Sequence, residues 1–290
     1  MFKGIIPALI TPIDARGNIN TVVLNKIVED LIEGGADGFY LCGATGEGLN
    51  LTVTQHKEMT RQTIEIVAGR VPCIVHVART VYSEMIELAK YAESVGASAI
   101  SAIPPIFFKY DEDEIFSYYE TLAGSVNIPI VIYNSPAAAV AFSNSLLDRL
   151  FAIPNLTSIK WTNSNYATVM SVKSRNPEAN FINGPDEMLL QGLAAGCDAG
   201  IGTTYNFLLP EIKGIYKAFL MGNTEEAKRL QSYVARICEV FHGRSVIMTT
   251  KFIMSKLGYD VYYPIHPMLR LTEKEELAVL DYLRRQGMKI

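Results

Sequence analysis

The chain has 290 residues, of which 49% are hydrophobic and 19% are charged, and its formal net charge is -4. This composition excludes a disordered chain, and the length allows either two domains or one barrel with an extension. The slightly acidic balance, with no run of Lys or Arg, argues against a nucleic-acid or anionic-membrane partner. We therefore expect a soluble cytoplasmic protein.

The amino-terminal segment is too short for a secretory signal, and Pro7 and Pro12 interrupt its apolar run. No stretch reaches the roughly 18 uninterrupted apolar residues of a membrane helix. The four cysteines are scattered without zinc-site or CxxC spacing, which predicts reduced thiols. The four histidines do not cluster either, so we predict no metal.

Short β-type runs alternate with amphipathic helical stretches from the start of the chain. The first predicted strand is Gly4–Thr11, and the helix within Thr21–Glu33 has its apolar residues at helical spacing. Pro129–Tyr133 is rich in β-branched residues, as strands are. The other predicted strands are Gly38–Cys42, Pro72–Val77, Ala97–Ile103, Leu156–Lys160, Asn180–Ile182 and Asp198–Gly202.

About eight strand–helix units result, which is the number that a (β/α)8 barrel needs. A doubly wound sheet is the alternative, although the G-x-G-x-x-G fingerprint is missing after the first strand. The rest of the chain has only helical patterns, at Thr224–Val240, Ser245–Lys256 and Thr272–Gln286. We therefore predict a (β/α)8 TIM barrel over residues 1–222 and a C-terminal helical extension over residues 223–290, packed on the barrel.

Polar residues end several strands, at the side where such a barrel carries its active site. Lys160 follows an apolar run, and it either points into the barrel mouth or reaches solvent at the strand terminus. In the barrel mouth, loss of hydration favours the neutral amine, which is the nucleophile for Schiff-base chemistry. Tyr133 is either a proton donor and acceptor or an aromatic ring packed at the rim. Both residues are candidates for catalysis.

Two further segments are candidates for binding. Gly43–Gly48 is a glycine-rich loop whose amides can hold an anion, but it is not a Walker loop. Asp186 and Glu187 follow the seventh strand and can accept hydrogen bonds from hydroxyl groups. They equally fit an ordinary acidic first turn of the next helix. Taken alone, each segment leaves both interpretations open.

Taken together, these segments resemble the dihydrodipicolinate synthase/N-acetylneuraminate lyase family of pyruvate-dependent class I aldolases. The resemblance extends over almost the whole chain and implies a homotetramer that uses no cofactor besides a covalent imine. The matching motifs are Gly43-Ala44-Thr45-Gly46-Glu47, Tyr133-Asn134-Ser135-Pro136, Ile159-Lys160, Gly184-Pro185-Asp186-Glu187 and Gly200-Ile201-Gly202-Thr203-Thr204-Tyr205-Asn206.

The resemblance also implies a role for each matching residue. Lys160 matches the lysine that forms an imine with a 2-oxo acid, usually pyruvate, and Tyr133 matches the tyrosine that shuttles protons. Ala44 and Thr45 match the loop that binds the pyruvate carboxylate. A carboxylate held there would orient the carbonyl carbon toward the lysine.

Several positions resemble the N-acetylneuraminate lyase branch more than the synthase branch. Where the synthase branch usually has an arginine for a second carboxylate, this chain has Ala138. The residues that the resemblance assigns to the polyol tail of a sugar acid are Thr162, Gly184, Asp186, Glu187, Gly202 and Thr203.

Two positions depart from the family pattern. The family usually has Ser or Thr in place of Ala44 and Tyr in place of Phe107. Those hydroxyls normally join the catalytic tyrosine in a proton relay, so the usual relay is interrupted here.

We therefore expect an N-acetylneuraminate lyase-type enzyme that cleaves a 2-oxo sugar acid reversibly to pyruvate and an aldehyde. One alternative is another family enzyme, such as a 2-keto-3-deoxy-sugar-acid aldolase or dehydratase, or dihydrodipicolinate synthase. A second alternative, which the interrupted relay keeps open, is a catalytically silent member that binds small molecules.

Overall fold

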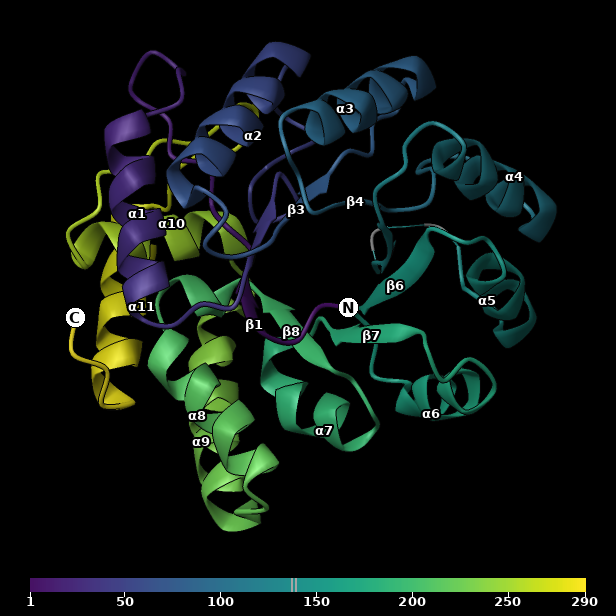
Figure 1. Ribbon diagram of the computed structural model, residues 1–290. Coiled ribbons are helices and arrows are strands. Elements are labelled where there is room, and N and C mark those ends of the chain that lie inside the picture. Colours follow the sequence, from purple (N-terminus) through teal and green to yellow (C-terminus); the bar gives the residue numbers. More distant parts are fainter. Residues whose placement is uncertain (137, 139) are drawn as a thin grey trace.

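The computed structural model describes residues 1–136, 138 and 140–290 of the chain. In this part, eight strands alternate with helices around a common axis (Figure 1). The strands are β1 (Gly4–Pro7), β2 (Phe39–Leu41), β3 (Cys73–His76), β4 (Ala99–Ala102), β5 (Ile130–Asn134), β6 (Leu156–Trp161), β7 (Asn180–Asn183) and β8 (Ala199–Gly202). The helices of the alternation are α1 (Thr21–Glu33), α2 (Val53–Val67), α3 (Tyr82–Ser94), α4 (Glu112–Ala123), α5 (Asn144–Phe151), α6 (Tyr166–Arg175), α7 (Leu189–Ala194) and α8 (Leu209–Leu220).

The strands form one parallel sheet in the order β1-β8-β7-β6-β5-β4-β3-β2. The sheet closes where Ala8, just after β1, forms a parallel bridge with Tyr40 of β2. At the same place, the Leu9 N–H donates to the Tyr40 carbonyl at 3.0 Å. The predicted (β/α)8 barrel is thereby confirmed, and the doubly wound alternative is wrong.

Burial explains why these segments form these elements. All five residues of β5 are buried, and its β-branched side chains fill the barrel wall. On α1 the buried residues recur at helical spacing, and they are Leu24, Ile27, Val28 and Leu31. Capping boxes begin α2, α4 and α11 (Glu273–Arg285), where Thr52, Asp111 and Thr272 accept hydrogen bonds from backbone amides.

The first strand is shorter than predicted. It ends at Pro7 rather than Thr11, because its register with β8 ends there and the next residue, Ala8, forms only an isolated bridge with β2. Thr11 instead donates its hydroxyl to the Gly46 carbonyl at 2.6 Å. The residues after β1 therefore support the loop that follows β2.

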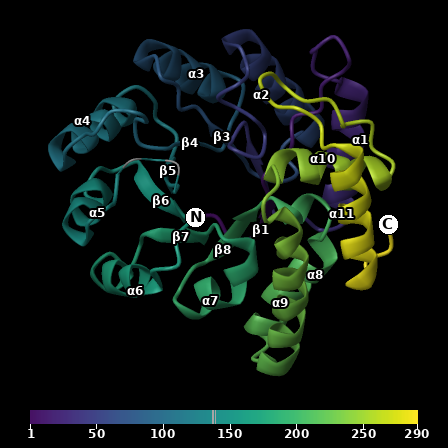
Figure 2. The ribbon, with the colours of Figure 1, turned by 180° about the vertical axis from the view of Figure 1, so that it is seen from behind.

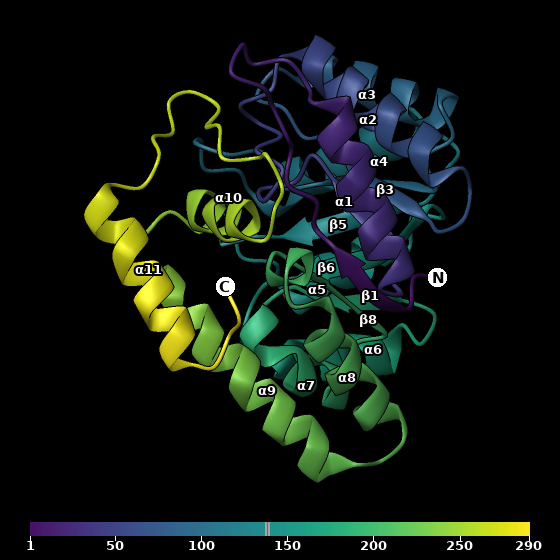
Figure 3. The ribbon, with the colours of Figure 1, turned by 90° about the vertical axis from the view of Figure 1, so that its left-hand side faces the viewer.

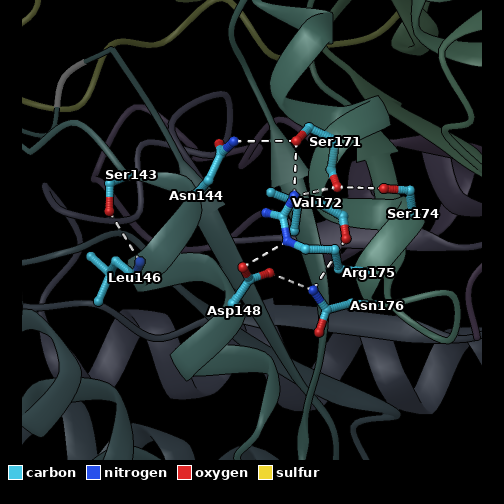
Figure 4. A network of polar contacts seen from close by, with 9 residues as sticks. All are labelled: Ser143, Asn144, Leu146, Asp148, Ser171, Val172, Ser174, Arg175 and Asn176. Atoms are coloured by element: carbon cyan, nitrogen blue, oxygen red, sulfur yellow. Dashed lines mark hydrogen bonds and ion pairs between the residues drawn. The ribbon is translucent and has the colours of Figure 1, made fainter.

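A polar network joins the neighbouring helices α5 and α6 on the outside of the barrel (Figure 4). Arg175 Nε donates to Asp148 Oδ2 at 2.9 Å, and Asn176 Nδ2 donates to Asp148 Oδ1 at 2.6 Å. Exposed pairs of this kind contribute little stability individually. They connect the two helices that flank β6 in the sequence.

Three more helices follow the barrel helices: α9 (Thr224–Cys238), α10 (Val246–Lys256) and α11. The predicted helix over Thr224–Val240 instead ends at Cys238 and continues as the 3-10 turn η3 (Glu239–Phe241). Helix α9 runs alongside α8 (Figure 2), and α10 lies between the barrel and α11 (Figure 3). α9 packs against η1 (Asp186–Met188) and α10 against η2 (Thr204–Asn206), the turns after β7 and β8. Elements beyond residue 222 thus reach the C-terminal ends of the strands, while the division of the chain at residue 222 stays a prediction.

Candidate active site

Lys160 lies inside the barrel among aromatic rings. It pairs in register with Tyr133 on the adjacent strand, and the residue is only 6% exposed. Its Nζ is 4.2 Å from the centre of the Tyr133 ring and 4.6 Å from the centre of the Tyr40 ring. Because β2 and β6 are not neighbours in the sheet, the contact with Tyr40 spans the barrel interior. Of the two positions left open for Lys160, the structure therefore has the one inside the barrel.

Tyr40 and His76, the other aromatic side chains with polar groups near Lys160, are both engaged in hydrogen bonds. Tyr40 donates its hydroxyl to Ser101 Oγ at 3.0 Å, and burial raises the pKa of this phenol. His76 Nε2 accepts from the Ile103 N–H at 3.3 Å. Burial lowers the pKa of His76 to about 3, with further contributions from His56 and Lys160, so its ring is neutral.

Tyr133 differs from these neighbours. Its ring stands edge-on to those of Tyr40 and His76, with centroids 6.1 and 5.9 Å apart. Its hydroxyl has no hydrogen-bond partner within the part of the chain that the structure describes. A phenol that is placed beside an amine and is not otherwise engaged is available to exchange protons with a ligand.

The glycine-rich loop lies at the same end of the barrel as Lys160. Thr45 is buried, and its hydroxyl forms a 2.6 Å hydrogen bond with the hydroxyl of Thr203, which follows β8. Gly48 is required for the tight turn, because a Cβ there would lie 1.7 Å from the Cys42 carbonyl oxygen. Ala44, in contrast, is exposed and lines a cavity of about 220 Å³. The loop is thus held at Thr45 and Gly48 and open at Ala44.

A larger cavity of about 850 Å³ opens between the strand ends and the turn η3. It brings together five of the six residues assigned to a polyol tail: Thr162, Gly184, Asp186, Glu187 and Thr203. Its lining also includes four residues from the end of α9 and the following turn that the sequence patterns did not indicate, namely Cys238, Glu239, Phe241 and His242.

Gly202, the sixth of these residues, has a different environment. It is buried at the end of β8, and a Cβ there would lie 2.1 Å from Asp186 Oδ1. Its contribution to the site is therefore the space that it leaves for the Asp186 carboxylate. Gly184 leaves similar space for Thr162, whose Oγ1 would be 2.1 Å from such a Cβ.

The two acidic residues after β7 also differ from each other. Asp186 is buried, and its Oδ2 accepts from both the backbone N–H and the hydroxyl of Thr204 at 2.7 Å. Burial raises the pKa of Asp186 to about 6, although the hydrogen bonds from Thr204 oppose this rise. Glu187 is exposed on the cavity wall. Of these two residues, only Glu187 has a side chain that is open to solvent.

The two departures from the family pattern have unlike positions. Ala44 shares its cavity with His76 and Ser135, close to the ring of Tyr133. Phe107 is 87% exposed in the loop after β4, with its ring edge-on to that of Phe108. Of these two positions in a single chain, only that of Ala44 would place a hydroxyl in the site if the residue were replaced by Ser.

The described residues were searched for metal-binding groups and for helices that could span a membrane. Among them, no group of three or more His, Cys, Asp or Glu is placed to hold a metal ion. No helix in this part of the chain is long and apolar enough to cross a membrane. The cysteines are unpaired, and burial raises the thiol pKa of Cys42, Cys73 and Cys197 to about 12.

The chain is similar to known proteins over its whole length. It matches the model of the Dihydrodipicolinate synthetase family over residues 1–286. A protein named N-acetylneuraminate lyase from Rhizobium meliloti (strain 1021) is 31% identical over 282 residues, which cover 97% of this chain and 93% of that protein.

Two solved structures have nearly the same fold. YagE from E. coli K12 is a prophage protein of the dihydrodipicolinic acid synthase family, and its structure is a complex with pyruvate. It is similar to this chain with a TM-score of 0.95 and 26% identity over 100% of both chains. CdNal from Clostridium difficile, in complex with mannosamine, has a TM-score of 0.94 and 27% identity over 99% of both chains.

Proposed function

This chain belongs to the dihydrodipicolinate synthetase family of pyruvate-dependent class I aldolases, and we propose that it is an N-acetylneuraminate lyase-type enzyme. Its reaction is the reversible cleavage of a 2-oxo sugar acid to pyruvate and an aldehyde, through an imine on Lys160. The observation that carries this proposal is the Lys160 amine, buried inside the barrel 4.2 Å from the centre of the Tyr133 ring.

The chemistry follows from these two side chains. The Lys160 amine attacks the keto carbon of the substrate, and the new hydroxyl leaves as water with a proton from Tyr133, which gives a protonated imine. This imine accepts the electron pair of the C–C bond that breaks. The aldehyde forms as the Tyr133 phenolate takes the proton from the substrate hydroxyl, and the phenol then gives that proton to the enamine carbon. Hydrolysis of the imine releases pyruvate and restores the amine.

The imine itself is the electron sink, so the proposed reaction needs no cofactor or metal. Ala44 and Thr45 are the proposed anchors for the pyruvate carboxylate, because the loop that contains them lies at the Lys160 end of the barrel and is held by Thr203. A fixed carboxylate supplies the orientation that a bimolecular attack would lack. The pyruvate bound to YagE is consistent with such a substrate in this fold.

The aldehyde half of the substrate is proposed to be a neutral or cationic polyol. The 850 Å³ cavity has the carboxyl groups of Asp186, Glu187 and Glu239 in its described lining, but neither Lys nor Arg. Carboxylates accept hydrogen bonds from hydroxyls and repel a second carboxylate. The mannosamine complex of CdNal gives an example of an amino sugar bound in this fold.

The direct test is pyruvate release from a panel of 2-oxo sugar acids. We expect activity on at least one hydroxylated substrate and none in Lys160→Arg, because a guanidinium stays protonated and cannot attack a carbonyl. Lys228→Arg, at an exposed position on α9, is the matched control and should retain activity. Release of pyruvate by Lys160→Arg would contradict the imine mechanism, and binding without turnover in the parent protein would favour a silent binding protein.

The proposal also includes a cytoplasmic homotetramer. Sedimentation equilibrium of the full chain measures the assembly directly, and a monomer at assay concentration would contradict this part of the proposal alone.

A further inference from the structure

A buried ion pair joins the loop after β2 to α10. Glu47 pairs through Oε1 with Lys251 Nζ, and neither side chain has any exposed surface. Lys251 Nζ also donates to the Tyr263 carbonyl at 2.9 Å, while Glu47 Oε2 accepts from the Ile265 N–H at 3.3 Å. One pair of charges therefore joins three segments: the Gly43–Gly48 loop, α10 and the chain between α10 and α11.

A buried ion pair is costly to desolvate, and its contribution to stability is often smaller than that of an apolar pair. Its clearest effect is geometric, because each unpaired charge would remain buried if the segments moved apart. The link thus penalises any displacement of the loop relative to α10. It holds two regions that are distant in sequence at a fixed separation.

Glu47 is also tightly coupled to the middle of its own loop. Its backbone has a left-handed conformation with φ 55, which a non-glycine residue adopts only when its surroundings enforce it. Its N–H donates to the Ala44 carbonyl at 3.1 Å, and the Gly48 N–H donates to the Gly43 carbonyl at 3.0 Å. A shift of Glu47 would therefore be transmitted to the Ala44–Thr45 peptide.

The segment after α10 reaches the same loop from outside. Met268 lines the 220 Å³ cavity together with Gly43, Ala44 and His76. Met268 follows Tyr263 and Ile265, the two residues whose backbone groups bond to the ion pair. The link thus also determines how one wall of this cavity is placed.

We propose that Glu47 and Lys251 are positioning residues that hold the carboxylate-binding loop in its working geometry, with the segment from Tyr263 to Met268 as one wall of that subsite. The proposal rests on the function proposed above, since it assumes that the loop holds the carboxylate of pyruvate. Neither residue touches the reacting atoms. Their effect is on the affinity for pyruvate rather than on imine chemistry at saturation.

The experiment titrates pyruvate against the full chain, reduces the imine with borohydride and quantifies the adduct on Lys160 by peptide mass mapping. The variants are Lys251→Met and the double variant Glu47→Gln/Lys251→Met. The double variant removes both charges, so it leaves none buried without a partner and retains the fold if the single variant does not. Lys256→Met, at an exposed position on the same helix, is the control.

We expect the half-saturating pyruvate concentration to rise ~10–100-fold in both variants. A displacement of a positioning group by about 1 Å can cost a factor of this size. The maximal adduct at saturation should stay near that of the parent and of Lys256→Met. A merely structural role would lower the midpoint of thermal unfolding and leave half-saturation of the folded protein unchanged, and that result would overturn the proposal. A parent protein that forms no adduct at any pyruvate concentration would instead overturn the proposed function, and this proposal with it.

Discussion

Lys160 and Tyr133 are directly paired in register on adjacent parallel strands, and the Lys160 Nζ lies 4.2 Å from the centre of the Tyr133 ring. The Tyr40 ring on the far side of the barrel, 4.6 Å from the same nitrogen, limits where the amine can move. Two neighbouring strands therefore supply the proposed nucleophile and the proposed proton carrier, with little freedom for either to change place.

Tyr133→Phe should lower kcat by ~10²–10⁴-fold, the usual contribution of a general acid–base group. Pyruvate should still be trapped on Lys160, because the amine and the carboxylate loop are unchanged. Steady-state kinetics with a good sugar-acid substrate, together with borohydride trapping, measure both quantities.

Tyr40→Phe is the matched control for this change. The Tyr40 hydroxyl is already bonded to Ser101, so its removal should cost about 1 kcal/mol of stability and leave most of the turnover. Equal losses of kcat in the two variants would show that Tyr133 has no special role in proton transfer.

Ala44→Ser should raise turnover several-fold, since it returns a hydroxyl to the cavity that Ala44 shares with His76 and Ser135. The increase is a fraction of the ~10²–10⁴-fold that a complete proton-transfer group contributes. Unchanged or lower turnover in Ala44→Ser, with folding verified, would mean that the added hydroxyl is left unpaired.

Phe107→Tyr tests whether the second departure matters, because this exposed side chain is remote from the site within one chain. An additive increase in turnover when Phe107→Tyr is combined with Ala44→Ser would require Phe107 to reach a site in the assembled protein.

Aspartate semialdehyde should be a poor partner for pyruvate compared with neutral polyol aldehydes. Ala138 lines a cavity of about 430 Å³ beside Asn134 and Trp161, and the described lining of this cavity has no charged residue. Ala138→Arg should raise kcat/KM for the semialdehyde ~10–100-fold, since a charge-assisted hydrogen bond contributes about 1.5–3 kcal/mol. Ala138→Leu controls for side-chain volume. A parent protein that prefers the semialdehyde would place it in the synthase branch.

The pH dependence of stability should reflect Asp186. Burial raises its pKa to about 6 from an ordinary 3.8, so between these values the folded chain holds a proton that the unfolded chain has released. The stability that this group contributes is therefore fully present below about pH 4 and is lost as the pH rises past 6. As the pH rises from 4 to 7.5, the free energy of unfolding of Asp186→Asn should increase by ~3 kcal/mol relative to that of the parent, because the parent loses this contribution and the variant does not. Urea unfolding at the two pH values measures this, and an identical difference at both would contradict the burial argument.

The order of strands and helices could be predicted because each barrel strand is a short apolar run between amphipathic helices. The early end of β1 could not, since it depends on where its register with β8 ends, at the pair of Pro7 with Gly202. Helix α9 also ends sooner than its pattern suggests, where the chain turns through η3 toward the cavity. Both differences arise from tertiary contacts that a local pattern does not contain.

The positions of Lys160 and Tyr133 could be predicted because residues at the ends of parallel barrel strands converge. Tyr40 could have been added by the same reasoning, since it points inward on β2. The ion pair of Glu47 with Lys251 could not, because a lone lysine in a helical stretch has the pattern of a solvent-exposed residue. Only the docking of α10 against the barrel end buries it completely.

The most direct test of this account is reduction of the full chain with borohydride in the presence of isotopically labelled pyruvate, followed by peptide mass mapping. We expect one labelled adduct, on the peptide that contains Lys160, and none without pyruvate or in Lys160→Arg. A label on any other lysine, or no label at pyruvate concentrations that saturate substrate turnover, would contradict it.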